Sequence, residues 1–221
     1  MHSATRVQNE VALISLAAAA LDYFNTHVVP RIYGWGAPVG EPQPAQGWTL
    51  QELLPGMTLE DALPTMDLQR KEQDFELPET ITGFGGVTFD PDGRIVSAVM
   101  PTVGEGPWPT YEASFKGRLA VALQKAGDNS YIKGWHANGL RKRLDAWVKR
   151  GLPAHFEGLT SKDEKAIIHS DFAASSILYD AESGRITGLI GYDFSCVLHP
   201  SYEFLRSFSN LGGQFRGWTT D

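Results

Sequence analysis

The apolar positions near the start of the chain recur at the spacing of a helix. One stripe consists of Leu13, Leu16, Ala17, Ala20, Leu21 and Phe24. The apolar run at residues 11–21 is too short to span a bilayer, and Asn9 and Glu10 stand directly before it. This pattern predicts a buried amphipathic helix that ends near Asn25, because Pro30 bars its continuation. A cleaved signal peptide is the alternative interpretation of the same run.

Short apolar runs predict strands in the next part of the chain. Residues 31–36 form a run that closes on glycine, and residues 48–54 form a second run after a loop rich in proline and glycine. Pro55 and Gly56 interrupt the pattern, and Thr58 is placed to cap a following helix. We therefore expect a small strand region that gives way to a helical region near residue 56.

The remaining pattern alternates between hairpins and helices. A Pro-Asp-Gly turn at residues 91–93 lies between two runs of strand-forming residues, so residues 86–97 predict a hairpin. The other expected elements are helices at 110–125, 138–149 and 202–208, a strand at 165–169, and a hairpin of 177–179 with 185–190. No regular strand-helix-strand alternation is present, so the pattern predicts an α+β fold.

The composition is that of an ordinary globular protein, with 221 residues, 42% of them hydrophobic and 20% charged. Lys and Arg total 19 against 26 Asp and Glu, and the formal net charge of -7 argues against a nucleic-acid or anionic-membrane surface. A phosphate-bearing ligand would therefore need local cations or a metal ion. The single cysteine, Cys196, excludes an internal disulfide and fits a reducing compartment.

Residues 168–180 carry the most specific motif. Kinase-like phosphotransferases place a His, one further residue and an Asp in a catalytic loop, with an Asn five residues after the Asp. His169 and Asp171 have this spacing, and Phe172 is typical of the branch that acts on small molecules. The Asp accepts the proton of the attacking hydroxyl, and the Asn binds a metal ion. Position 176, where the Asn is expected, is serine.

A second metal ligand is expected on the following hairpin, as an Asp after two apolar residues. The sequence has Gly191 at this place, and glycine has no carboxylate. Asp193 lies two residues later, on the same side of an extended strand as residue 191. Two extended residues span roughly 6–7 Å, so Asp193 reaches the metal only if the loop shifts. A structural, hydrogen-bonded Asp193 is the alternative.

In this order the motifs resemble the aminoglycoside-phosphotransferase, or phosphotransferase-enzyme, family, and especially its divergent fungal members. Residues 169–180 resemble the catalytic loop of the family, and residues 189–200 resemble the metal-binding turn after it. Residues 7–11 resemble the start of the small-lobe helix whose Glu, here Glu10, pairs with a strand lysine. The other matching segments are 30–36 (the next strand), 48–56 (the hinge that meets the adenine) and 83–86 (a loop common in this branch).

The resemblance implies a protein-kinase-like α+β fold, with a curtailed β-rich small lobe and hinge at residues 1–56 and a mainly helical large lobe at residues 57–221. It also implies transfer of phosphate from ATP, with magnesium, to a hydroxyl of a small molecule of the secondary-metabolite or antibiotic type. The residues that it assigns to this chemistry are Asp171 and His169 for catalysis, Glu10, Glu52, Leu53 and Leu54 for the nucleotide, and Ser176 and Asp193 as weak metal contacts.

The sequence also departs from the family pattern. It opens at the helix glutamate, so the glycine-rich loop and the phosphate-binding lysine have no counterpart, and we expect a truncated member. Three interpretations follow: an active phosphotransferase with a degraded metal site, a catalytically inactive pseudo-phosphotransferase that binds a ligand or a partner, or a partial gene product. We expect a cytoplasmic protein with a small-molecule substrate and with neither nucleic acid nor membrane as a partner.

Overall fold

The computed structural model describes residues 4–22, 27–36, 47–58, 76–131 and 138–207 of the chain. Helices and strands mix there without regular alternation, so the fold is α+β, as the pattern predicts. The α-helices are α1 (Ala4–Asp22), α3 (Tyr111–Asp128), α5 (Leu140–Ala146), α6 (Leu152–Glu157) and α7 (Ser201–Arg206). The strands are β1 (Ile32–Gly36), β2 (Trp48–Gln51), β3 (Met57–Thr58), β4 (Gly86–Phe89), β5 (Ile95–Ala98), β6 (Ala166–Ile168), β7 (Ile177–Asp180), β8 (Arg185–Leu189) and β9 (Cys196–Leu198).

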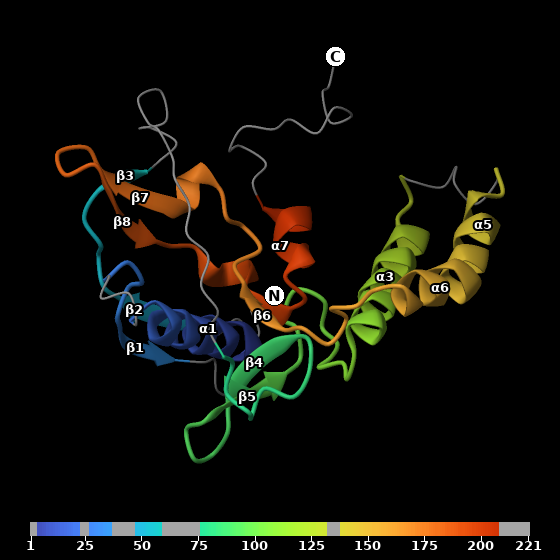
Figure 1. Ribbon diagram of the computed structural model, residues 1–221, viewed down its shortest axis with the longest axis horizontal. Coiled ribbons are helices and arrows are strands. Elements are labelled where there is room, and N and C mark those ends of the chain that lie inside the picture. The colour runs from blue at the N-terminus through green and yellow to red at the C-terminus, as the bar shows by residue number, and fades with distance from the viewer. Residues whose placement is uncertain (1–3, 23–26, 37–46, 59–75, 132–137, 208–221) are drawn as a thin grey trace.

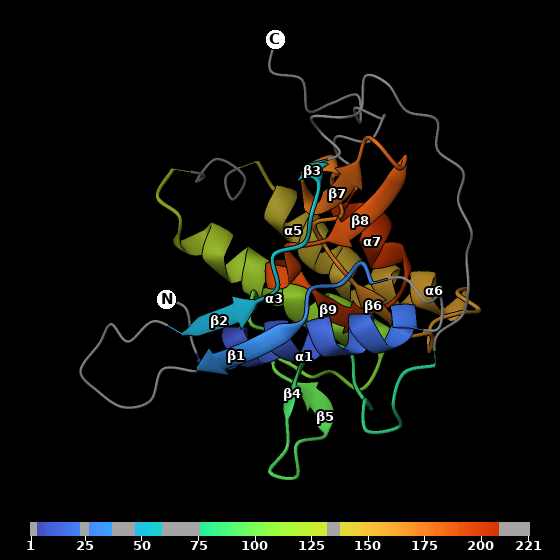
Figure 2. The ribbon, with the colours of Figure 1, turned by 90° about the vertical axis from the view of Figure 1, so that its left-hand side faces the viewer.

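The described strands form several small antiparallel sheets. β1 pairs with β2, β4 pairs with β5, and β6 pairs with β9, while β7 lies between β3 and β8 in a three-stranded sheet. Figures 1 and 2 show α1 between the β4–β5 hairpin on one side and the β3–β7–β8 sheet on the other. This arrangement brings α1 close to the segment that follows β8.

Helix α1 is a central packing element of the described fold. One side packs on Val87 of β4 and Val197 of β9, and another side packs on Val29 and Tyr192. The buried α1 residues in these two clusters are Ala12, Leu13, Ile14, Leu16 and Ala17. The predicted buried helix is therefore confirmed, although it begins earlier than the apolar run, and its predicted end lies outside the described residues. Among the helices described, none is both long enough and apolar enough to cross a membrane.

The predicted hairpin at residues 86–97 is confirmed as β4–β5. Its turn is closed by Asp90, whose Oδ1 accepts hydrogen bonds from the backbone amides of Asp92 at 2.9 Å and Arg94 at 2.8 Å. The Asp90 side chain bonds only to nearby backbone amides. A turn of this kind can therefore be predicted from the local sequence.

The predicted helices at 110–125 and 138–149 are also present. Thr110 caps α3 by accepting a hydrogen bond from the Ala113 amide at 3.1 Å. The second helix runs further than predicted, because α5 continues through a π-helical turn, Trp147–Gly151, into α6.

Thr58, which was predicted to cap a following helix, lies in a strand. Thr58 lies in β3 and pairs with Leu178 of β7, and Met57 pairs with Tyr179. The cap residue of a helix has an extended backbone itself, so this pairing is compatible with a cap at Thr58. Residues 59–75, where the rest of that helix was expected, lie outside the described residues.

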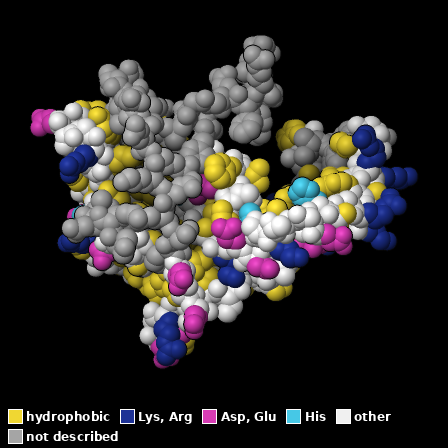
Figure 3. All heavy atoms as spheres, viewed as in Figure 1, with side chains coloured by type: hydrophobic (Ala, Val, Ile, Leu, Met, Phe, Trp, Pro, Cys, Tyr) yellow, Lys and Arg dark blue, Asp and Glu magenta, His cyan; other side chains and the backbone are white. Residues whose placement is uncertain are grey.

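Helices α3, α5 and α6 form an arm that projects from the body of the molecule (Figure 1). Its root packs in one core cluster through Tyr111, Leu152 and Phe156. Lys and Arg side chains gather at the far end of the arm (Figure 3). The exposed cations of α5 and of the segment Trp147–Gly151 are Lys142, Arg143, Lys149 and Arg150. This group of positive charges thus lies on the arm and not at the loop that follows β6.

Candidate functional site

The motif predicted to be a catalytic loop follows directly on β6. Ser170 has a φ of 64° and is the one non-glycine residue with positive φ in the described part of the chain. The left-handed conformation costs a non-glycine residue about 1–2 kcal/mol, so other contacts must hold it. Ser170 is buried, whereas Asp171, the next residue, is exposed. The turn therefore presents the Asp171 carboxylate at the surface.

Glu203 of α7 holds this turn in place. Its Oε2 accepts a hydrogen bond from the His169 amide at 2.6 Å, and its Oε1 accepts one from the Ser170 amide at 3.0 Å. The hydroxyl of Ser207 donates to the same carboxylate and accepts from the Phe172 amide at 2.9 Å. Hydrogen bonds to a charged acceptor are stronger than neutral ones, so this clamp can offset the strain at Ser170.

Glu203 and Ser207 were missing from the predicted site residues. Their i, i+4 spacing on the helix after the hairpin is a weak signal in the sequence. Their role depends on the position of α7 against the loop, which local pattern does not give.

His169 is buried and connects the loop to the hairpin. Its Nε2 lies 2.9 Å from the carbonyl oxygen of Ile190, so this nitrogen donates the hydrogen bond. Its ring also makes edge contacts with Phe172 and Tyr192. Burial lowers the pKa of His169 below its ordinary value of 6.5, against the raising effect of the Ile190 carbonyl and nearby carboxylates. A neutral, buried imidazole positions the loop that carries Asp171.

Ser176 and Gly191, the two positions where metal ligands were expected, are neighbours in space. A Cβ on Gly191 would lie 3.5 Å from Ser176 Oγ, and the Ile190 amide donates to the Ser176 carbonyl at 2.9 Å. The fold has thus brought the two positions together across the β7–β8 hairpin. The side chains present there offer one neutral hydroxyl and no carboxylate.

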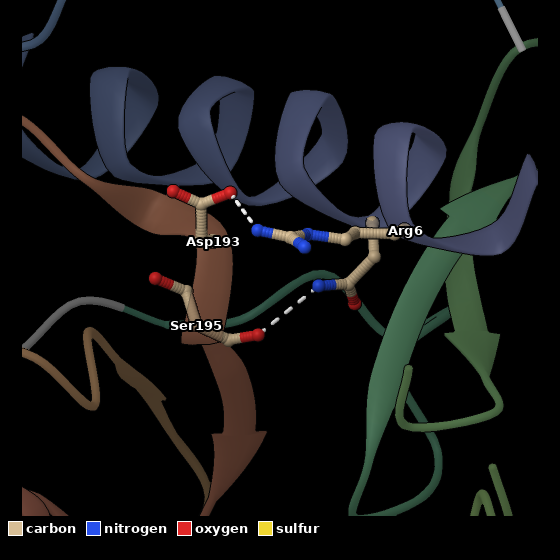
Figure 4. Close-up of polar contacts among 4 residues, drawn as sticks. Arg6, Asp193 and Ser195 are labelled. Atoms are coloured by element: carbon tan, nitrogen blue, oxygen red, sulfur yellow. Dashed lines mark hydrogen bonds and ion pairs between the residues drawn. The ribbon is translucent and has the colours of Figure 1, made fainter. Parts of the chain in front are cut away.

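Asp193, the third expected metal contact, forms an ion pair with Arg6 of α1. Figure 4 shows the Arg6 guanidinium extending from the helix to the Asp193 carboxylate, with Nη2 next to Oδ1. The pair is partly exposed, with 31% of the Arg6 side chain and 42% of the Asp193 side chain accessible. Asp193 is thus hydrogen-bonded in this structure, and its role as a metal contact stays a prediction.

Asn9 fixes α1 at this place. It is almost fully buried, and its Nδ2 donates to the Ser195 carbonyl at 3.1 Å, while its Oδ1 accepts from the Val87 amide at 2.8 Å. One side chain therefore joins α1 to β4 and to the segment after Asp193. In the sequence, Asn9 is only a polar residue directly before the apolar run.

Glu10 belongs to the same group of charges. Burial raises the pKa of Glu10, the Asp193 carboxylate raises it further, and the Arg6 guanidinium lowers it. The resemblance predicted a lysine as the partner of this glutamate. Among the described residues, the charged groups that shift its pKa are Asp193 and Arg6.

The three predicted hinge residues have different surroundings. The Glu52 carboxylate accepts from the Arg31 amide at 3.1 Å, which lowers the pKa of Glu52, and lies 2.6 Å from His27 Nε2. Leu53 is exposed, whereas Leu54 packs on β8, where a Cβ at Gly188 would lie 2.8 Å from Leu54 Cδ1. The segment thus runs alongside the hairpin that leads to Gly191, and its nucleotide contacts stay a prediction.

The residues around Ser176 do not fit a magnesium ion. Magnesium is held in such sites by carboxylates together with substrate phosphates. Gly191 offers no side-chain oxygen, Ser176 offers a neutral one, and the Asp193 carboxylate is engaged by a guanidinium. Nowhere in the described ranges do three or more His, Cys, Asp or Glu side chains group as metal ligands would.

The fold and the site together define an α+β protein with an exposed aspartate on a clamped His-x-Asp loop. The model of the phosphotransferase enzyme family matches residues 2–217 of the chain. The chain therefore belongs to this family, as the motifs predicted. Neither a curated protein nor a solved structure gives a significant match.

Proposed function

We propose that this protein transfers the terminal phosphate of ATP to a hydroxyl of a small molecule, with Asp171 as the catalytic base. Membership of the phosphotransferase enzyme family supports phosphotransferase chemistry in general. The observation that carries the assignment is the exposed Asp171 carboxylate next to the left-handed turn that Glu203 clamps. A general base must be held in place and must be open to substrate, and Asp171 meets both conditions.

In the proposed reaction, the hydroxyl oxygen of the acceptor forms a bond to the γ-phosphorus while its proton passes to the Asp171 carboxylate. The bond between the γ-phosphorus and the bridging oxygen breaks, and ADP leaves with the electron pair. Asp171 then releases the proton to solvent. A base of this kind contributes about 10²–10⁴-fold to the rate.

The proposal includes a protein-kinase-like arrangement, with a small lobe and hinge at residues 1–56 and a large lobe at residues 57–221. Packing of Leu54 on Gly188 supports a hinge that lies beside the β7–β8 hairpin. ATP is the proposed phosphate donor, and a small molecule, rather than nucleic acid or membrane, is the proposed acceptor. A cytoplasmic location is supported by the single cysteine.

A specific observation favours a second candidate, a pseudo-phosphotransferase that binds a ligand without turnover. Ser176 and Gly191, the two predicted metal-ligand positions, are neighbours in space but offer no carboxylate. A protein with these two positions in place but without metal ligands on them can bind a ligand without catalysing phosphate transfer.

The test is phosphate transfer from ATP to a panel of small alcohols, by wild type and by Asp171→Asn. The expected loss is about 10²–10⁴-fold in turnover, with ATP affinity little changed. Asp163→Asn, at an exposed aspartate outside the loop, is the matched control and should keep full activity. Activity that is unchanged in Asp171→Asn contradicts the mechanism. Ligand binding without any turnover by wild type supports the pseudo-phosphotransferase instead.

A further inference from the structure

We propose that the Arg6 guanidinium takes the place of the metal ion as the fixed cation of this site, so that the protein binds polyphosphate without magnesium. This inference rests on the proposed function, since it names how the same site would hold the phosphate donor. The starting observation is that the residues around Ser176 do not fit a magnesium ion. Polyphosphate brings several negative charges, and neither Ser176 nor Gly191 can hold the ion that usually offsets them.

Arg6 is paired with the segment that carries one of the expected metal-ligand positions. Its guanidinium contacts Asp193, two residues along the chain from Gly191, and Gly191 in turn adjoins Ser176. The Arg6 side chain is 31% accessible, so an anion in solution can reach it. A guanidinium is always charged and matches the geometry of phosphate oxygens.

The cation is held by the fold. Asn9, one turn further along α1, bonds the Ser195 carbonyl and the Val87 amide, which fixes the helix against the segment that carries Asp193. Arg6 and Asp193 are far apart in sequence, yet α1 and this segment are joined at two neighbouring points (Figure 4). Preorganised charge of this kind costs little reorganisation when an anion binds.

Arg6 also disfavours a divalent cation at the same place. Its positive charge neutralises the Asp193 carboxylate and would repel magnesium from it. The competing prediction, in which Asp193 is a metal contact, requires this ion pair to break. Arg6 as the fixed cation and Asp193 as a metal contact therefore predict opposite changes in polyphosphate affinity when Asp193 loses its charge.

The experiment measures binding of ATP and of inorganic tripolyphosphate by calorimetry, in EDTA and in magnesium. Wild type should bind both anions in EDTA, and magnesium should not tighten binding. Arg6→Gln should weaken binding in EDTA by about tenfold or more, and Arg6→Lys should restore part of it. Arg94→Gln removes an exposed guanidinium that pairs with Asp92 on the β4–β5 hairpin and is the matched control.

Asp193→Asn should change the affinity for polyphosphate in the opposite direction to Arg6→Gln. It removes the carboxylate that competes for Arg6, so polyphosphate should bind more tightly in EDTA. If wild type instead binds more tightly with magnesium and Asp193→Asn loses this gain, Asp193 is a metal ligand and the inference is overturned. The comparison of wild type with and without magnesium needs no variant, so it decides the question even if Arg6→Gln does not fold.

The outcomes separate this inference from the proposed function. Tripolyphosphate binding that depends on Arg6, without phosphate transfer, supports the inference and contradicts the function. Phosphate transfer that requires magnesium supports the function and overturns the inference. Absence of polyphosphate binding by wild type in EDTA overturns the inference whatever the activity.

Discussion

The hydroxyl oxygen of Ser176 lies 3.5 Å from the point that a Cβ on Gly191 would occupy. Ser176 directly precedes β7, and Gly191 lies two residues after β8. The hydrogen bond from the Ile190 amide to the Ser176 carbonyl keeps them together. The distance is an ordinary van der Waals contact, so a side chain at position 191 has room. The two positions at which metal ligands were predicted are therefore adjacent, and neither carries a carboxylate.

The double variant Ser176→Asn with Gly191→Asp should gain magnesium binding, because it places an amide oxygen and a carboxylate at these adjacent positions. Gly191 has a φ of 83°, where Asp and Asn are tolerated better than other side chains. We expect Gly191→Ala to lose about 1–2 kcal/mol of stability and Gly191→Asp to lose less. Calorimetric titration with magnesium measures the gain.

The matched control for that gain is Ser176→Asn with Gly191→Asn, which has the same shape without the carboxylate. It should not bind magnesium. Equal binding by both double variants would show that the ion binds elsewhere.

Replacement of Glu203 by Ala should destabilise the protein by about 2–4 kcal/mol. The carboxylate accepts from the His169 and Ser170 amides, and both donors lose their acceptor in the variant. Urea unfolding gives the free energy, and the exposed Glu182→Ala is the control, with an expected change within about 0.5 kcal/mol. A Glu203→Ala protein as stable as wild type would mean that the clamp contributes little.

Asn9→Ala should cost about 2–3 kcal/mol of stability, because it leaves the Val87 amide and the Ser195 carbonyl without their partner in a buried place. Gln8→Ala is the matched control. The Gln8 side chain also contacts β4, through Thr88 Oγ1 at 3.1 Å, but this bond is only partly buried and should be worth less than about 1 kcal/mol. Thermal unfolding of the two variants should separate them clearly, and equal losses would contradict the proposed anchor.

Stability should fall as pH drops below about 6.5, and His169 should be one cause. The pKa of His169 is lowered by burial, so the unfolded chain binds a proton before the folded one does. The contribution of His169 to stability is complete above the unfolded pKa and is lost as pH falls toward the folded pKa. For one proton the slope is at most about 1.4 kcal/mol per pH unit.

The control for this pH dependence is His169→Gln, which can still donate a hydrogen bond to Ile190 but does not titrate. Urea unfolding of both proteins across pH 5–8, about 1.5 units on either side of the ordinary His pKa, gives the comparison. The slope of wild type should exceed that of the variant. Identical slopes would mean that His169 keeps an ordinary pKa in the folded protein.

The sequence by itself determined the elements whose causes are local. The turn at residues 91–93 specified the β4–β5 hairpin, and the spacing of apolar residues specified that α1 is buried. It also located His169 and Asp171 in a loop before a hairpin, because the motif and the hairpin are continuous in the chain.

The tertiary structure alone decided which residues distant in the sequence come into contact. Thr58 took a strand conformation because β7 is its partner, Glu203 reached the loop because α7 packs there, and Arg6 met Asp193 because α1 crosses the segment after β8. Each of these contacts joins residues that are distant in sequence. Their side chains have nearly the same local patterns as ordinary solvated residues, so local pattern is too weak to distinguish them. Only the packing of α1 and α7 in two core clusters that share β9 brings these groups within reach of one another.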